Sequence, residues 1–222
     1  MARKPFFHAP LRHSAVMHRR TRRQLQRWPA PVRGMLWMVA GGLCFSFLNT
    51  LARVLSQQLD VYQAQFLRYL LGLIVMLPLV WRHGLQAYRP VNVAGQFWRG
   101  AVHTLGLILW FTALPRIPLA DMTAIGFTGP IFIMIGAAWF LGEPMRRDRW
   151  VAALIGFAGV LVVVLPKMTG AGGWYNLVML ASSPVFAASF LITKALTRYE
   201  KPGVIVLWQA LTVTVLSLPM AL

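Results

Sequence analysis

Charge-poor apolar segments recur along the whole sequence, and they limit the fold more than any other feature does. They cover residues 34–54, 62–81, 97–115, 119–141, 150–166, 174–196 and 203–222. A helix rises about 1.5 Å per residue, so roughly 20 residues cross the hydrocarbon core of a bilayer. Moreover, 58% of the residues are hydrophobic and only 12% are charged, about half the charged fraction of soluble domains. The pattern predicts an all-α polytopic membrane protein with seven transmembrane helices.

Residues 1–32 form a basic tail that contains no acidic residue. A formal net charge of +17 in so apolar a chain indicates membrane orientation rather than nucleic-acid binding. Cytoplasmic loops carry an excess of Lys and Arg, and the loops opposite the tail receive only Arg53, Arg116 and Lys167. We therefore expect a multi-pass protein of the inner membrane with a disordered cytoplasmic tail. Two alternatives for the tail stay open: a transit peptide, or a start codon further into the sequence.

A weak internal repeat occurs at an offset of 141 residues. It pairs Phe45 with Phe186, Arg53 with Lys194, Leu77 with Leu218 and Pro78 with Pro219. Because the offset spans five helices, an odd number, the second copy would cross the membrane in the opposite orientation, as in the inverted repeats of secondary transporters. We expect residues 33–166 to be a first five-helix repeat and residues 174–222 to begin a second. A complete second copy would need three more helices, so the repeat predicts a truncated chain.

Several motifs resemble the EamA repeat of the drug/metabolite transporter superfamily. The resemblance covers about residues 34–222 and is most specific in ALPRIPLADMTAI, in the proline within GFTGPIF, in LGEP and in GFAGV. It also includes Arg68 within the second apolar segment. The resemblance implies ten helices built from two inverted five-helix repeats, and it implies the transport of small metabolites or drug-like molecules.

Pro130 is expected to distort the helix predicted over 119–141. Proline lacks an N–H and crowds the carbonyl four residues back, so the helix should kink near its middle. The freed carbonyl would then face a polar cavity, or the kink would only fit the neighbouring helices; both explanations stay open.

Gly142, Glu143 and Pro144 should end that helix and start a charged turn. Glu143 should hold the following loop, with a gating role as the alternative. Its expected partners are Arg146, Arg147 and Arg149. In the next helix, Gly156 and Gly159 form a face of small residues together with two alanines a turn earlier, and this face predicts close helix packing.

Three predicted helices carry unusual residues at a spacing of i, i+4, i+7 and i+11, which places each set on one helix face. The sets are Gly42, Ser46, Asn49 and Arg53; Arg99, His103, Gly106 and Trp110; and Thr123, Phe127, Pro130 and Met134. Lipid penalises Asn, His and Arg side chains, so these faces should point into the bundle. The candidates for a substrate cavity are Ser46, Asn49, Arg68, His103, Trp110, Thr123 and Phe127.

Each polar candidate also has a purely structural explanation. Asn49 and His103 would either hydrogen-bond a polar metabolite or form interhelical bonds that only hold the bundle together. Arg68 would either extend outward toward Asp60 or attract an anionic group of the substrate.

The sequence favours a secondary transporter that moves a small metabolite by alternating access. No carboxylate occupies a predicted midplane, so exchange or facilitated movement is favoured over proton coupling through Asp or Glu, and a permanent organic cation fits poorly as substrate. A membrane-embedded enzyme is the first alternative, although no catalytic cluster, metal site or cofactor motif is evident. A half-protein that needs a partner is the second. The expected partners are the metabolite and the bilayer, and homodimerisation stays open.

Overall fold

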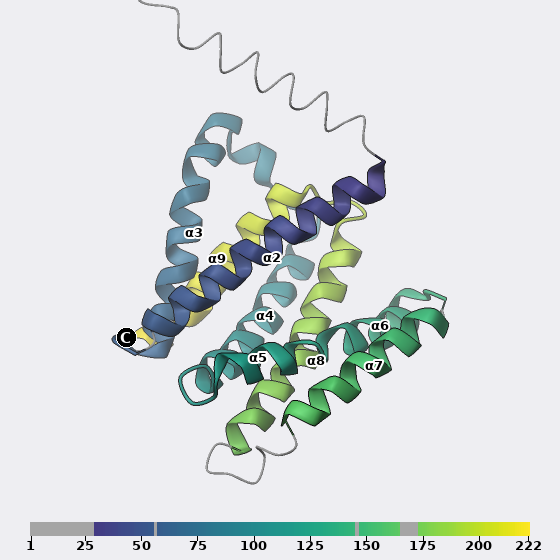
Figure 1. Cartoon of the computed structure of the whole chain (residues 1–222). Coiled ribbons are helices and arrows are strands. Elements are labelled where there is room, and N and C mark those ends of the chain that lie inside the picture. The colour runs from purple at the N-terminus through teal and green to yellow at the C-terminus, as the bar shows by residue number, and fades with distance from the viewer. Residues whose placement is uncertain (1–28, 56, 145–146, 165–172) are drawn as a thin grey trace, which may run out of the picture. The chain divides into compact units, whose positions relative to one another are not determined.

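A computed structural model describes residues 29–55, 57–144, 147–164 and 173–222 (Figure 1). The described residues form helices connected by short loops and contain no strand. The α-helices are α2 (Ala30–Leu55), α3 (Val61–His83), α4 (Val93–Ala113), α5 (Leu119–Gly126), α6 (Gly129–Leu141), α7 (Arg147–Val164), α8 (Gly173–Leu196) and α9 (Pro202–Ala221), with a 3₁₀ turn, η1, at Leu85–Tyr88. Most of the predicted tail lies outside the described residues.

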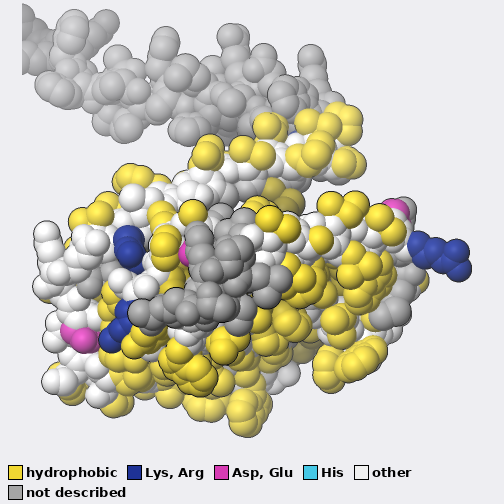
Figure 2. All heavy atoms as spheres, turned by 60° about the horizontal axis from the view of Figure 1, so that its bottom comes forward, with side chains coloured by type: hydrophobic (Ala, Val, Ile, Leu, Met, Phe, Trp, Pro, Cys, Tyr) yellow, Lys and Arg dark blue, Asp and Glu magenta, His cyan; other side chains and the backbone are white. Residues whose placement is uncertain are grey.

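Each of the seven predicted apolar segments coincides with helix, and the segment over 119–141 is divided into α5 and α6. Within the described ranges, five stretches are long and apolar enough to cross a membrane: Pro31–Leu55, Val61–His83, Leu119–Leu141, Gly173–Leu196 and Pro202–Ala221. Figure 2 shows hydrophobic side chains over most of the described surface in its view. The prediction of an all-α polytopic membrane protein is confirmed. That α4 and α7 also cross the membrane stays a prediction.

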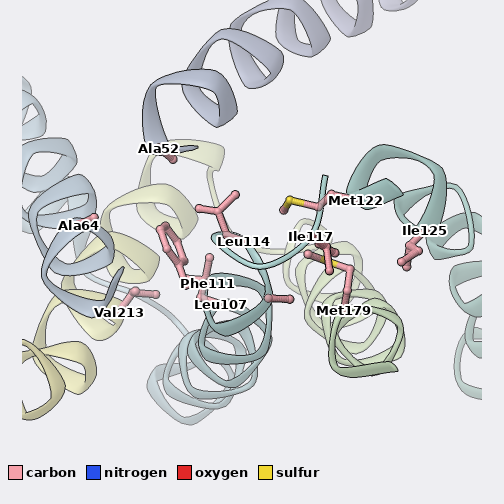
Figure 3. Close-up of a cluster of buried hydrophobic side chains, with 11 residues drawn as sticks. Ala52, Ala64, Leu107, Phe111, Leu114, Ile117, Met122, Ile125, Met179 and Val213 are labelled. Atoms are coloured by element: carbon pink, nitrogen blue, oxygen red, sulfur yellow. The ribbon is translucent and has the colours of Figure 1, made fainter. Parts of the chain in front are cut away.

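The chain divides into two units, Met1–Leu51 and Ala52–Leu222. In the first unit, the described residues belong to α2. In the second unit, α4 packs against both α8 and α9, α3 packs against α9, and α6 packs against α8. The core of the second unit is a cluster of hydrophobic side chains around Phe111 of α4, Leu114 just after α4, and Val213 of α9, all fully buried (Figure 3).

Glycines allow α4 and α6 to lie close to their neighbours. A Cβ added at Gly100 of α4 would lie 2.5 Å from Thr212 of α9, and one at Gly106 would lie 2.9 Å from the Phe186 ring of α8. The prediction for α7 is wrong in the described structure: a Cβ at Gly156 or Gly159 would meet no described atom within 4 Å. Small residues permit close packing but do not show which helix has a partner.

The distortion expected at Pro130 is a break between α5 and α6. Pro130 lies in the first turn of α6, where its missing N–H has no intrahelical acceptor to lose. At the break, the Thr128 hydroxyl is buried and donates to the Ile125 carbonyl at 2.7 Å. The Thr128 backbone N–H donates to the same carbonyl at 2.9 Å, so the side chain and the backbone together stabilise this turn.

Two polar caps fix the start of α4. The buried carboxylate of Glu200 accepts from the backbone N–H groups of Val91 and Asn92 at 2.7 and 3.1 Å. The Asn92 side chain in turn accepts from the Gly95 N–H at 2.8 Å. Because Glu200 follows α8, these bonds tie the start of α4 to the end of α8 and so position the polar face of α4.

The helix ends agree with the internal repeat. Positions 55 and 196, where α2 and α8 end, differ by 141, and so do positions 61 and 202, where α3 and α9 begin. Two matching boundaries support the repeat, while its inversion stays a prediction.

Candidate functional site

A partly buried polar cluster lies among α3, α4 and α8, and we call it the His103 cluster. It consists of Tyr69 of α3, Arg99 and His103 of α4, and Ser189 and Thr193 of α8. The His103 ring is hydrogen-bonded on both edges: Nε2 lies 2.9 Å from the Tyr69 hydroxyl, and Nδ1 lies 3.3 Å from the Ser189 hydroxyl. Each hydroxyl can donate or accept, so a neutral imidazole is satisfied on both sides.

The tautomer of His103 is coupled to the direction of the Ser189 hydroxyl proton. The Ser189 hydroxyl also donates to the Arg99 carbonyl at 3.4 Å. If its proton goes there, Nδ1 carries the ring proton and Nε2 accepts from Tyr69. The ring edges of Tyr69 and Phe186 enclose His103, at centroid distances of 6.2 and 5.2 Å. The imidazole is therefore held in one orientation by contacts from two neighbouring helices.

Arg99 carries a cation into the buried part of the bundle. It is 8% exposed, and its Nε donates to the Thr193 hydroxyl at 2.5 Å while Nη1 donates to the Ile205 carbonyl at 3.1 Å. Both of these described partners are uncharged. A buried cation is expensive unless an opposite charge compensates it. The arrangement therefore suits the binding of an anionic or electron-rich group.

Fully buried amides extend the polar face beyond the cluster. Gln65 lies one turn before Tyr69 on α3, and Gln96 lies one turn before Arg99 on α4. Both are 0% exposed, and neither amide has a hydrogen-bond partner among the described residues. Buried polar groups are satisfied in most proteins. These two amides are therefore buried groups with hydrogen-bonding capacity that no described residue uses.

The structure places the predicted cavity residues in different surroundings. His103 is the one predicted candidate found in the cluster. Trp110 packs edge-on against Phe111 at 5.0 Å, beside the hydrophobic core, and Phe127 is 62% exposed at the break between α5 and α6. Arg68 is half-buried, and the carboxylate of Asp60 accepts from backbone N–H groups at the start of α3.

Three other candidates are not joined to the cluster by any described contact. Ser46 and Asn49 belong to the first unit, and the side chain of Thr123 lies outside the described part of the chain. Their place in a cavity stays a prediction.

Four members of the cluster were absent from the predicted cavity. Arg99 did have a signal, because it shares the helix face of His103. Tyr69 directly follows Arg68, but a tyrosine in an apolar segment gives no specific sign of a binding site. The sequence contains no signal for Ser189 and Thr193, because hydroxyl residues are common in membrane helices. Their partners on α4 lie 86 and 94 positions away in the chain.

Glu143 forms its described ion pair with Lys194 of α8. The predicted partners were arginines of the loop that follows. Gly142 ends α6 in the left-handed conformation, at a φ of 66°, and this turn sends the Glu143 side chain toward α8. The hydrogen bond from Lys194 lowers the pKa of Glu143. The pair links the end of α6 to the last turn of α8.

Comparisons with known proteins give a consistent result. The model of the EamA-like transporter family matches residues 32–165. The chain is 35% identical to the riboflavin transporter of Rhizobium johnstonii over 86% of this chain and 64% of that protein. It is 31% identical to the riboflavin transporter of Vibrio cholerae, over 86% of this chain and 65% of that protein. It is 27% identical to the S-adenosylmethionine uptake transporter of Rickettsia felis, over 85% of this chain and 64% of that protein. The chain thus spans about two thirds of the length of these relatives. No solved structure matches.

Proposed function

The chain belongs to the EamA-like transporter family, and from this premise we propose that it is part of a secondary transporter for a small polar metabolite. The protein resides in the inner membrane and works by alternating access between two inverted repeats, the first over 33–166 and the second beginning at 174. The names of its relatives support transport rather than catalysis.

The His103 cluster is the proposed binding site for the polar part of the substrate. His103 and Tyr69 exchange their mutual hydrogen bond for bonds to the substrate, and Arg99 attracts an anionic or electron-rich group. The observation that carries this proposal is the buried Arg99, whose described partners are uncharged. Neutral, zwitterionic and anionic metabolites fit this site better than cations do. Arg68 and Trp110, which belong to the same unit as the cluster, are the further residues proposed to contact the substrate.

Riboflavin and S-adenosylmethionine are the first compounds to test, because two groups of relatives are named for them. The full-length protein is reconstituted in liposomes, and uptake and exchange of each labelled compound are measured. His103→Ala and Tyr69→Phe should each lower the initial rate of the transported compound roughly tenfold, because each removes one hydrogen bond to a polar group in a partly buried site.

The matched control is His83→Ala. His83 is an exposed histidine in the last turn of α3 whose ring bonds the Leu79 carbonyl, so transport should be unchanged. Thermal unfolding of each variant separates lost transport from lost folding. Unchanged transport in both cluster variants would exclude this binding site, and the absence of any movement of either compound by folded wild-type protein would exclude these two substrates.

A further inference from the structure

A hollow of about 160 Å³ lies between α6, α7 and α8, and no member of the His103 cluster lines it. Its wall includes Ile133 and Ala137 of α6 and Trp150 of α7, and its rim carries Glu143, Arg149 and Lys194. A cavity of about 150 Å³ with apolar walls holds a benzene ring. The hollow therefore has room for a short stretch of hydrocarbon beside its charged rim.

The hollow lies at the level where helices leave the hydrocarbon. α6 ends at Leu141, α7 begins at Arg147, and Lys194 is in the last turn of α8. In the last turn of α6, Trp139 and Phe140 are 77% and 80% exposed, as expected of aromatic side chains at a membrane–water interface. A ligand in the hollow could thus contact apolar and aqueous surroundings at once.

The rim carries an excess of positive charge. Lys194 is paired with Glu143, while Arg149 is exposed beside them. Arg149 and Arg198 both act on Glu143 through their charge. Among the residues that line the hollow, an anion would therefore meet two cations, Arg149 and Lys194, against the carboxylate of Glu143.

We propose that the hollow binds an anionic phospholipid. The lipid phosphate lies at Arg149 and competes with Glu143 for Lys194, and the first methylene groups of an acyl chain pack on Ile133 and Ala137. A soluble anion has no hydrocarbon to pack on the apolar wall, so the wall would not strengthen its binding. A zwitterionic lipid would gain less at the rim, because its own cation is repelled there.

Native mass spectrometry of the full-length protein tests the proposal. The protein is incubated in neutral detergent with equal amounts of phosphatidylglycerol and phosphatidylcholine. We expect phosphatidylglycerol to be retained preferentially, and Arg149→Gln should lower its retention roughly five-fold, the effect typical of one basic residue near an anionic headgroup.

Arg147→Gln is the matched control, because it removes the same charge from the same helix turn at an exposed residue that does not line the hollow. Its retention of phosphatidylglycerol should stay at the wild-type level. Glu143→Gln should raise retention, since it frees Lys194 for the phosphate. Ala138→Leu, which fills the hollow without changing charge, should lower it.

Three results would overturn the proposal. Equal retention of the two lipids would show that charge is not recognised. Equal losses in Arg149→Gln and Arg147→Gln would show a general surface effect. Complete displacement of the lipid by inorganic phosphate would assign the rim to a soluble anion. Because the assay measures no transport, its outcome is independent of the proposed function.

Discussion

Arg99 and Lys194 show two ways in which a cation is accommodated in this apolar chain. Arg99 lies inside the bundle and donates to a hydroxyl and a carbonyl, so its charge remains available to a ligand. Lys194 lies at a helix end and is paired with Glu143. A pair at this exposed position makes a small, pH-dependent contribution to stability. The buried cation is therefore the more informative residue about function.

The Glu143 ion pair makes a pH-dependent contribution with a defined sign. The hydrogen bond from Lys194 lowers the pKa of Glu143 from its usual 4.5, so the folded protein binds this proton less tightly than the unfolded chain does. The stabilisation is therefore complete above about pH 4.5 and is lost as the pH falls through the lowered pKa. Lys194→Met should reduce the loss of thermal stability on acidification, measured by unfolding in detergent. An acid dependence identical to that of the wild type would contradict this assignment.

Single residues could be predicted from the sequence where their type is rare in a membrane helix. His103 was found for that reason. Glu200 was not, because its bonds to Val91 and Asn92 join positions 109 and 108 apart in the chain. Hydroxyl and carboxyl partners of this kind depend on how helices are placed beside one another. Nothing in the local sequence around Glu200 specifies that placement.

Among the elements, α4 approaches two different helices closely at its glycines. Gly100 faces Thr212 of α9, and Gly106 faces Phe186 of α8. These two glycines flank His103 on α4 and allow α8 and α9 to approach its polar face. The apolar segments predicted α4 as a helix, but only the packing shows which of its glycines matter.

Gly100→Ala should destabilise the protein by about 1–3 kcal/mol, the usual effect of adding a methyl group to a well-packed interior. The added Cβ would lie 2.5 Å from two Thr212 carbons, so α4 and α9 would have to separate. Thermal unfolding in detergent measures the change. Gly156→Ala is the control, because its Cβ meets no described atom within 4 Å, and alanine favours a helix by up to about 1 kcal/mol. Similar melting temperatures for the two variants would show that α4 and α9 are not in close contact.

The whole molecule was predicted well in its helical segments and less well in its tertiary contacts. Apolar segments of membrane length identify helices because the bilayer imposes that length. The division at α5 and α6 also had a local cause in Pro130. By contrast, the His103 cluster depends on α4 and α8 lying side by side, which hydropathy does not encode.

The proposed topology can be checked with two matched cysteine variants. In a background in which Cys44 is replaced by Ser, Gln58→Cys and Gln86→Cys place one thiol at an exposed residue in successive loops. With a cytoplasmic N-terminus, a membrane-impermeant thiol reagent should label Gln58→Cys in intact cells and Gln86→Cys only after permeabilisation. The reverse pattern would show that the positive-charge bias does not set the orientation of this chain.

The two hydrogen-bonded edges of His103 have an evolutionary consequence. One ring nitrogen lies against Tyr69, from the part of the chain before α4, and the other against Ser189, from a helix much later in the sequence. A change at position 103 must suit both neighbours at once, and a change at either neighbour must suit the same ring. We therefore expect amino-acid substitutions at positions 69, 103 and 189 to occur together. The segments before and after α4 would then be constrained by each other at these positions.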